Sequence, residues 1–407
     1  VRQNSADAIA SYRAAPSIAN AGATYALDYA AYRYFEDGSG LSVTHQILHI
    51  QSRDGLTQYG EISVPPHAVL LRARTIKADG RYLEPDDIAG KETVSAPNLE
   101  VGDFVEWEYL EVIPPRRARD ATALGSRFYF QIVDVPMARS ELIVDVPSIW
   151  SPLTLDTRAG GPSPEITHAG GRTRYRFSVE GSPPATQEVS APDLAEVLPS
   201  VRYSHDIYWS DIIALFEDRA LGSVRVTGAL REHARALIEG AETQREAARR
   251  IYRFVVDEIE DTGGFLEQDP SWSLSTGEGE RLTLLLGLLQ AVELSPQVVF
   301  SRRWDSDQTD SPIPAVDDLP ETAVRLVLPG GDVWLNVSDE YAPFDYIGPS
   351  LQGAGGLVVV GGDGSEPHWV TIPTWPVEMQ EQQIELTLEL DPEGNLTGRA
   401  EERVPAS

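Results

Sequence analysis

Residues 275–294 read STGEGERLTLLLGLLQAVEL, a glycine-rich turn followed by an apolar segment. Leucine recurs around the whole circumference of that segment, so the sequence predicts a helix over residues 278–293 that is buried on all sides. The apolar run at 282–292 covers about half of a membrane span, which needs roughly 18 apolar residues. We therefore expect the core helix of a globular domain.

The segments around this helix predict a mixed domain. Three further helices are expected from apolar residues three or four apart, at residues 206–216, 224–239 and 243–258. A loop rich in Gly, Ser and Asp is expected at 261–277. Strands are expected at 297–302, 323–328, 332–338, 357–360 and 369–372. Helices followed by a small sheet form an α+β arrangement.

The N-terminal half has a different pattern. Short alternating runs with close turn signals extend from about residue 34 to 200, which favours an antiparallel β-sandwich. An alanine-rich segment at 3–33 predicts a helix, and residues 383–404 predict a hairpin that opens a further domain. The expected parts are a helical segment (1–30), a β-sandwich domain (31–204), an α+β core (205–376) and the beginning of a truncated C-terminal β domain (377–407).

Charge and cysteine content exclude several kinds of function. With 33 basic and 63 acidic residues, the formal net charge is −30. This field repels nucleic acid phosphates and anionic lipid headgroups, so neither is an expected partner. The chain has no cysteine, which excludes a thiolate nucleophile and zinc–thiolate or iron–sulfur sites. The acidic loop at 305–310 lacks the glycine and terminal glutamate of a calcium loop, so we expect neither a metal site nor a cofactor. We expect a soluble fragment whose compartment is open; a removed leader would fit the cell envelope or secretion.

The buried helix and the later hairpin resemble the transglutaminase-like superfamily, which has a papain-like core. In that family a Gly-acidic-Cys-basic motif opens the long helix, a histidine begins a later strand, and Trp-Leu-Asp follows on the return strand. The match places Gly279 at the cysteine, Thr322 at the histidine and Asn336 at the aspartate. Segments 34–38, 73–80 and 101–107 resemble the bacterial β-rich domain of unknown function that commonly precedes such cores. Together the resemblances span about residues 30–375.

The resemblance implies a pseudoenzyme. Papain-like catalysis needs a thiolate, an imidazole and a carboxylate, and all three positions are vacant here. No histidine lies between His233 and His368. Loss of one triad member typically costs on the order of a millionfold in rate. We therefore expect a non-catalytic binding or scaffold module for a polypeptide or a glycan such as a cell-wall polymer, with Trp272, Glu278 and Trp334 as candidates for lining the groove.

Two alternatives stay open. The chain could be a purely structural spacer in a larger multidomain assembly. It could also be a hydrolase with an unrecognised site, for which two carboxylates would have to converge in a cleft. A filled groove at Gly279 would favour a scaffold, whereas an open groove lined by Trp272 would favour binding.

Overall fold

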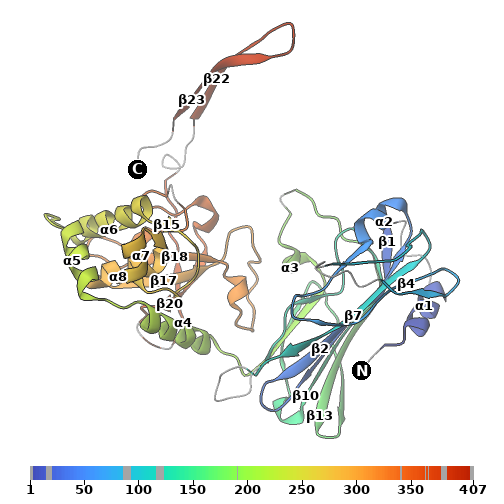
Figure 1. The fold of residues 1–407 in the computed structure, drawn as a ribbon. Coiled ribbons are helices and arrows are strands. Elements are labelled where there is room, and N and C mark those ends of the chain that lie inside the picture. Colours follow the sequence, from blue (N-terminus) through green and yellow to red (C-terminus); the bar gives the residue numbers. More distant parts are fainter. Residues whose placement is uncertain are drawn as a thin grey trace. The chain divides into compact units, whose positions relative to one another are not determined.

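The computed structural model describes residues 3–14, 21–85, 93–115, 123–189, 191–339, 342–362, 364, 366–376 and 383–403. These residues form a mixed α/β architecture with several sheets (Figure 1). The chain divides into two compact units, which we call unit 1 (Val1–Ile207 with Thr309–Ile313) and unit 2 (Tyr208–Gln308 with Pro314–Ser407). Among the described helices, none has the length and apolar character needed to cross a membrane.

Unit 1 consists mainly of strands. Its helices are α1 (Ser5–Ala14), α2 (Arg53–Tyr59), α3 (Leu194–Val197) and the 3-10 helix η1 (Ser148–Trp150). Its strands are β1 (Ala23–Tyr34), β2 (Gly40–Ile50), β3 (Glu61–Ser63), β4 (Val69–Ile76), β5 (Tyr82–Leu83), β6 (Thr93–Ser95), β7 (Phe104–Ile113), β8 (Ala123–Leu124), β9 (Phe128–Tyr129), β10 (Met137–Pro147), β11 (Thr154–Arg158), β12 (Glu165–Ala169), β13 (Arg172–Ser182) and β14 (Ser200–His205).

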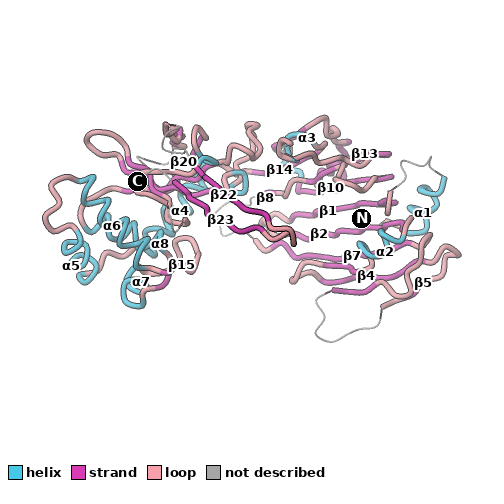
Figure 2. Tube along the Cα trace, turned by 90° about the horizontal axis from the view of Figure 1, so that it is seen from above, coloured by secondary structure: helices cyan, strands magenta, loops and turns pink. Residues whose placement is uncertain are grey.

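The main sheet of unit 1 has eight strands in the order β12-β13-β10-β1-β2-β7-β4-β5. Its strands run side by side in Figure 2, and β1 pairs with β10 in parallel whereas the other neighbours pair antiparallel. A second sheet has the order β11-β14-β8, with β9 also paired to β14. A short ladder joins β3 to β6.

Alternation of side chains gives the main sheet two buried faces. On one face, Leu142 and Phe177 share a core cluster with Val201 and Tyr203 of the second sheet. The opposite face contains Leu27, Tyr29, Ile47, Phe104 and Ile143, and α1 covers it with Ala8 and Ile9. The main sheet is therefore enclosed between a smaller sheet and a helix.

A buried ionic network lies beneath α1. The Glu106 carboxylate is inaccessible and accepts hydrogen bonds from His45, Ser5, Arg72 and Arg74. Burial alone would raise the pKa of Glu106, but these hydrogen bonds outweigh burial and lower the pKa to about 2. The network links the helix to three strands, so we assign it a structural role.

Along the chain of unit 2, most of the helices come first and most of the strands follow. Its helices are α4 (Trp209–Ser223), α5 (Gly228–Leu237), α6 (Gln244–Glu258), α7 (Pro270–Thr276), α8 (Arg281–Ala291), η2 (Val316–Asp318) and η3 (Pro349–Leu351). Its strands are β15 (Glu260–Asp261), β16 (Glu278–Gly279), β17 (Pro296–Ser301), β18 (Glu321–Leu326), β19 (Val333–Leu335), β20 (Gly355–Val360), β21 (His368–Thr371), β22 (Gln383–Leu390) and β23 (Leu396–Arg403).

The sheet of unit 2 has five antiparallel strands in the order β19-β18-β17-β20-β21. One face packs on the helices through a core that contains α8 almost entirely. The other face carries a separate cluster of Val299, Ala323, Trp334, Ile347, Leu351, Val358 and Ile372. The sheet therefore separates a helix side from a second apolar side.

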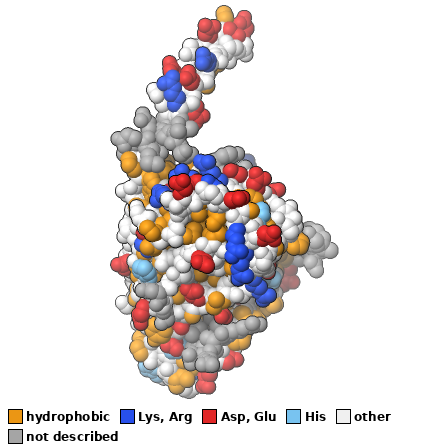
Figure 3. Space-filling view, turned by 90° about the vertical axis from the view of Figure 1, so that its left-hand side faces the viewer, with side chains coloured by type: hydrophobic (Ala, Val, Ile, Leu, Met, Phe, Trp, Pro, Cys, Tyr) orange, Lys and Arg blue, Asp and Glu red, His pale blue; other side chains and the backbone are white. Residues whose placement is uncertain are grey.

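The C-terminal strands β22 and β23 form a two-stranded hairpin. Ile384, Leu386, Leu388 and Leu390 alternate along β22, and each is more than half exposed. Figure 3 shows basic side chains lying among acidic ones on the face that it presents.

Several expected boundaries differ from the structure. Among the described residues of the helical segment expected over 1–30, α1 is the helical part, because Ala23–Tyr34 pairs with β2 and β10 as an interior strand. The alanine content of this stretch suggested a helix, but pairing on both edges overrides so weak a propensity. The loop expected at 261–277 contains α7, and the first residues of the helix expected at 278–293 form β16 instead. The hairpin expected at 383–404 is present as β22 and β23, and the division into two units assigns it to unit 2, while its role as the start of a further domain stays a prediction.

Candidate functional site

Gly279, the position that matches the family's cysteine, lies immediately before α8. It is buried and forms a short parallel ladder with β15. Its φ is +145°, a conformation that side chains of L-residues rarely adopt. A Cβ at this position would lie 2.2 Å from Gln268 Oε1 and 2.2 Å from Ser273 Oγ. The space into which a nucleophile would project is therefore filled.

The two groups that fill this space are held by hydrogen bonds. Gln268 Oε1 accepts one from the backbone N–H of Glu280 (2.9 Å) and one from the hydroxyl of Ser273 (3.1 Å). Ser273 is 1% exposed. In papain-like sites the amides at a helix N-terminus stabilise a thiolate. Here one of those amides already has a neutral side-chain partner.

Glu280 precedes α8 as its N-cap residue, and its side chain is buried. The carboxylate accepts hydrogen bonds from the backbone N–H of Glu267 and from the hydroxyl of Thr283. A Cβ at Gly264 would lie 2.4 Å from Glu280 Oε1, so this carboxylate occupies the space beside Gly264. A negative charge at a helix N-terminus interacts favourably with the helix dipole, which gives Glu280 a stabilising role.

Arg281, the first residue of α8, is also buried. Its Nε donates to the carbonyl of Ile259 (2.8 Å), and its Nη2 donates to the carbonyl of Val256 (3.0 Å). Both carbonyls lie at the C-terminal end of α6, where backbone acceptors lack partners within the helix. The guanidinium therefore caps α6 and holds it against α8.

Thr322, the position that matches the histidine, pairs with Phe300 across β17 and β18. Val324 and Leu326 on the same strand belong to the core on the helix side, whereas Ala323 belongs to the opposite side. Alternation along β18 therefore places Thr322 on the face of the sheet that carries the helices.

Asn336, the position that matches the aspartate, follows the end of β19. Its carbonyl accepts a hydrogen bond from the Tyr252 hydroxyl (2.7 Å), and its Oδ1 accepts one from the backbone N–H of Ser338 (3.0 Å). The Asn336 side chain thus stabilises a local turn. Gly279, Thr322 and Asn336 engage different partners, and no hydrogen bond joins them among the contacts described.

The three groove candidates lie on two sides of the sheet. Trp272 is 54% exposed on α7, and Glu278 is exposed on β16. Trp334 is buried in the cluster on the opposite side from the helices. The reason is the alternation along β19, in which Val333 and Leu335 point to the helix side. Trp334 therefore does not share a groove with Trp272 and Glu278.

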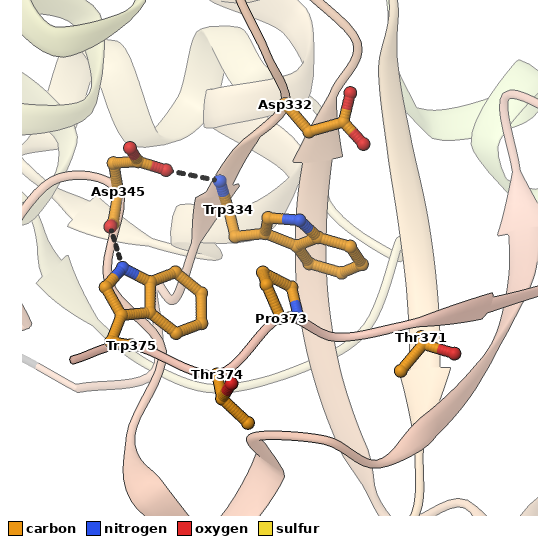
Figure 4. Close-up of a pocket in the computed structure, with 7 residues that line it drawn as sticks. All are labelled: Asp332, Trp334, Asp345, Thr371, Pro373, Thr374 and Trp375. Carbon is orange, nitrogen blue, oxygen red and sulfur yellow. Dashed lines mark hydrogen bonds between the residues drawn. The ribbon is translucent and has the colours of Figure 1, made fainter. Parts of the chain in front are cut away.

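Trp334 instead lines a cavity of about 410 Å³ on that second side (Figure 4). Its lining residues are Asp332, Trp334, Asp345, Thr371, Pro373, Thr374 and Trp375. Sequence reasoning missed all of these except Trp334, because the other residues come from the turn before β19, the loop that holds Asp345, the last residue of β21 and the segment after it. The nearest signal in the sequence was the pair Trp334 and Trp375, which lie far apart along the chain.

Two carboxylates line this cavity, and each is paired with an arginine. Asp332 Oδ2 accepts from Arg325 Nε at 2.7 Å and lies 2.6 Å from Arg325 Nη2. Asp345 pairs with Arg245 and accepts from the backbone N–H of Trp334 at 3.0 Å. Figure 4 shows the Asp332 carboxylate pointing away from Asp345. The residues described contain no group of three or more His, Asp or Glu side chains arranged to hold a metal ion.

No protein-family model and no curated protein matches the sequence. Among solved structures, the chain is similar to a candidate protease from Parabacteroides distasonis, with a TM-score of 0.67 and 16% identity over 87% of this chain and 72% of that one. An M1 zinc metallopeptidase from Deinococcus radiodurans aligns over 47% of this chain and 43% of its own, with 14% identity and a TM-score of 0.25. The second alignment is too weak to carry an argument. The first shows a shared fold across most of the chain.

Proposed function

We propose that this protein is a non-catalytic member of the transglutaminase-like superfamily that serves as a scaffold. In this proposal unit 2 is a degenerate papain-like core, and unit 1 is the β-sandwich domain that precedes such cores. The motifs around Gly279, Thr322 and Asn336 support the assignment. The long buried helix α8 against an antiparallel sheet is the arrangement that the family resemblance implies.

The observation that carries the proposal is the filled space at Gly279. A cysteine there would need a positive φ and would overlap Gln268 and Ser273. The nearby Ser273 hydroxyl does not replace it, because the hydroxyl donates to an amide oxygen, which is too weak a base to activate it. A filled position favours a scaffold over a module that binds ligands in the former catalytic groove.

Hydrolysis by carboxylates is the second candidate function. It is considered because the fold is similar to that of a candidate protease. A carboxylate pair needs one group protonated and one ionised, both facing the scissile bond. Asp332 and Asp345 are each held in an ion pair with a different arginine, so neither carboxylate is directed at a shared reacting atom. Their side chains also do not converge (Figure 4). This arrangement favours binding chemistry over hydrolysis.

The proposal is tested with the full chain in two activity assays. One measures cleavage of a quenched fluorescent peptide library between pH 5 and 9. The other measures incorporation of a fluorescent primary amine into a glutamine-containing protein. We expect both rates to equal the buffer background. Turnover above background that disappears in Ser273→Ala or Asp332→Asn, with the fold intact, would overturn the proposal and identify the nucleophile or acid.

A further inference from the structure

We infer that the cavity between β19, β21 and the segment after β21 binds a neutral sugar ring of an oligosaccharide. The cavity lies on the side of the sheet opposite the helices, so this inference is independent of the vacant catalytic position. Its volume of about 410 Å³ falls within the roughly 300–1,000 Å³ that is typical of small-molecule sites.

The aromatic wall of the cavity is held in place before any ligand arrives. Trp375 Nε1 donates to the carbonyl of Asp345 (2.9 Å), and the Trp375 backbone N–H donates to Gln352 Oε1 (3.0 Å). The Trp375 ring also makes an edge contact with Tyr346, with centroids 5.8 Å apart. A fixed indole loses little conformational entropy on binding, and its flat face suits the C–H face of a pyranose.

Trp334 is 3% exposed, so it backs the cavity wall from beneath and leaves Trp375 as the ring available for stacking. The Trp334 ring is held by burial in the cluster beneath and lies near the guanidinium of Arg325, whose Cζ is 5.8 Å from the ring centroid. Figure 4 shows the Trp334 and Trp375 rings on neighbouring sides of Pro373. Trp375 and the exposed Pro373 therefore form the apolar part of the wall, with the buried Trp334 ring supporting it.

The rim supplies polar groups that suit hydroxyls. Thr371 and Thr374 are exposed, and each hydroxyl can donate and accept a hydrogen bond. The Asp332 carboxylate is 33% exposed and can accept from a ligand hydroxyl in addition to its arginine partner. Apolar walls with a small number of polar groups are the usual composition of a small-molecule site.

Charge decides between a sugar and a cation. The two carboxylates would attract an ammonium or guanidinium ligand if they were unpaired. Each is already paired with an arginine, Asp332 with Arg325 and Asp345 with Arg245, so two negative charges face two positive ones. A cation therefore gains little Coulomb energy, whereas a neutral ligand still finds hydrogen-bonding groups. A neutral sugar fits this balance best.

The test is isothermal titration calorimetry of the full chain with four neutral hexasaccharides: cellohexaose, xylohexaose, maltohexaose and chitohexaose. We expect saturable binding of at least one, with a Kd that changes less than about twofold when NaCl rises tenfold, because no net charge is neutralised. Thr371→Val, which removes one hydrogen bond, should weaken binding about three- to tenfold. Trp375→Ala should weaken it by about tenfold or more.

Trp304→Ala is the matched control, because Trp304 is another tryptophan of unit 2 but is 64% exposed and does not line the cavity. It should bind like the unmodified chain. Circular dichroism identifies any variant that fails to fold, and Thr371→Val, at an exposed position, keeps the test usable if Trp375→Ala unfolds. The inference is overturned if none of the four sugars saturates by about 10 mM, a weak limit for such sites. It is equally overturned if Thr371→Val binds as tightly as the unmodified chain, or if a lysine-rich peptide binds instead and is displaced by salt.

Discussion

Replacing Gly279 by alanine adds one methyl group at the place where the family has its nucleophile. The backbone at φ +145° should cost about 1–3 kcal/mol for a residue with a Cβ. The methyl group would also displace Gln268 and Ser273, each 2.2 Å away. Displacement weakens the hydrogen bonds from Ser273 and from Glu280 to Gln268, worth about 0.5–1.5 kcal/mol each. We expect Gly279→Ala to destabilise unit 2 by about 2–6 kcal/mol in total.

Hydrogen exchange of the α8 amides measures this cost, because it reports opening of unit 2 separately from unit 1. Gly330→Ala is the control, since Gly330 has φ +97° and no atom within 4 Å of its Cβ position. That variant carries only the backbone cost, about 1–3 kcal/mol. Gly279→Ala should exceed it by at least about 1 kcal/mol, the value of the disturbed hydrogen bonds. Equal costs would show that the space beside Gly279 is open.

Three further variants test contacts that stabilise each unit internally. The folded-state pKa of Glu106, about 2, lies below the ordinary 4.5, so this residue stabilises unit 1 above pH 4.5 by about 3 kcal/mol and loses the contribution as pH falls toward 2. The free energy of unfolding, measured by circular dichroism as a function of pH, should therefore differ between Glu106→Gln and the unmodified chain at neutral pH but not near pH 2. Stability curves that stay parallel over this pH range would argue against the network. Arg281→Met should cost about 2–4 kcal/mol in α8 hydrogen exchange because two buried carbonyls lose their donor, whereas Arg253→Met, at an exposed position, should stay within about 0.5 kcal/mol. Tyr252→Phe should cost about 1–3 kcal/mol in urea unfolding, since one hydroxyl serves two carbonyls, and no change would mean that water replaces it.

The local patterns of the sequence predicted most of the elements of unit 2. The apolar run of α8 and the turn at 329–331 are determined by residues close together in the sequence. The turn lies where expected, and α8 lies within the expected range but begins at Arg281. Helix α7 was missed, although its signals were present. Asp269 caps it, Pro270 occupies its first turn, and Gly277 ends it in a left-handed conformation. A Gly- and Ser-rich composition concealed these signals.

Other features depend on contacts between distant residues, and no local pattern reveals them. The strand Ala23–Tyr34 is alanine-rich, and only its pairing with β2 and β10 makes it extended. The side of the sheet on which Trp334 lies depends on where β19 begins, and a shift of one residue would reverse it. The filling of the space at Gly279 likewise depends on Ser273 in α7 and on Gln268 just before that helix, in a stretch expected to be a loop.

A cysteine introduced at position 279 tests whether the nucleophile position is closed. The chain has no cysteine, so Gly279→Cys would carry a single thiol whose labelling by a disulfide reagent is unambiguous. Glu278→Cys, at the exposed neighbouring residue, is the control and should react at the rate of a free thiol. In samples with native circular dichroism, we expect Gly279→Cys to react at least about 100-fold more slowly than Glu278→Cys. The reason is that local opening of the structure at a cost of about 3 kcal/mol exposes the thiol in under roughly 1% of molecules. Labelling as fast as that of Glu278→Cys, or a reaction that persists at acidic pH as a lowered thiol pKa would allow, would mean that the catalytic groove is open and that the scaffold account is wrong.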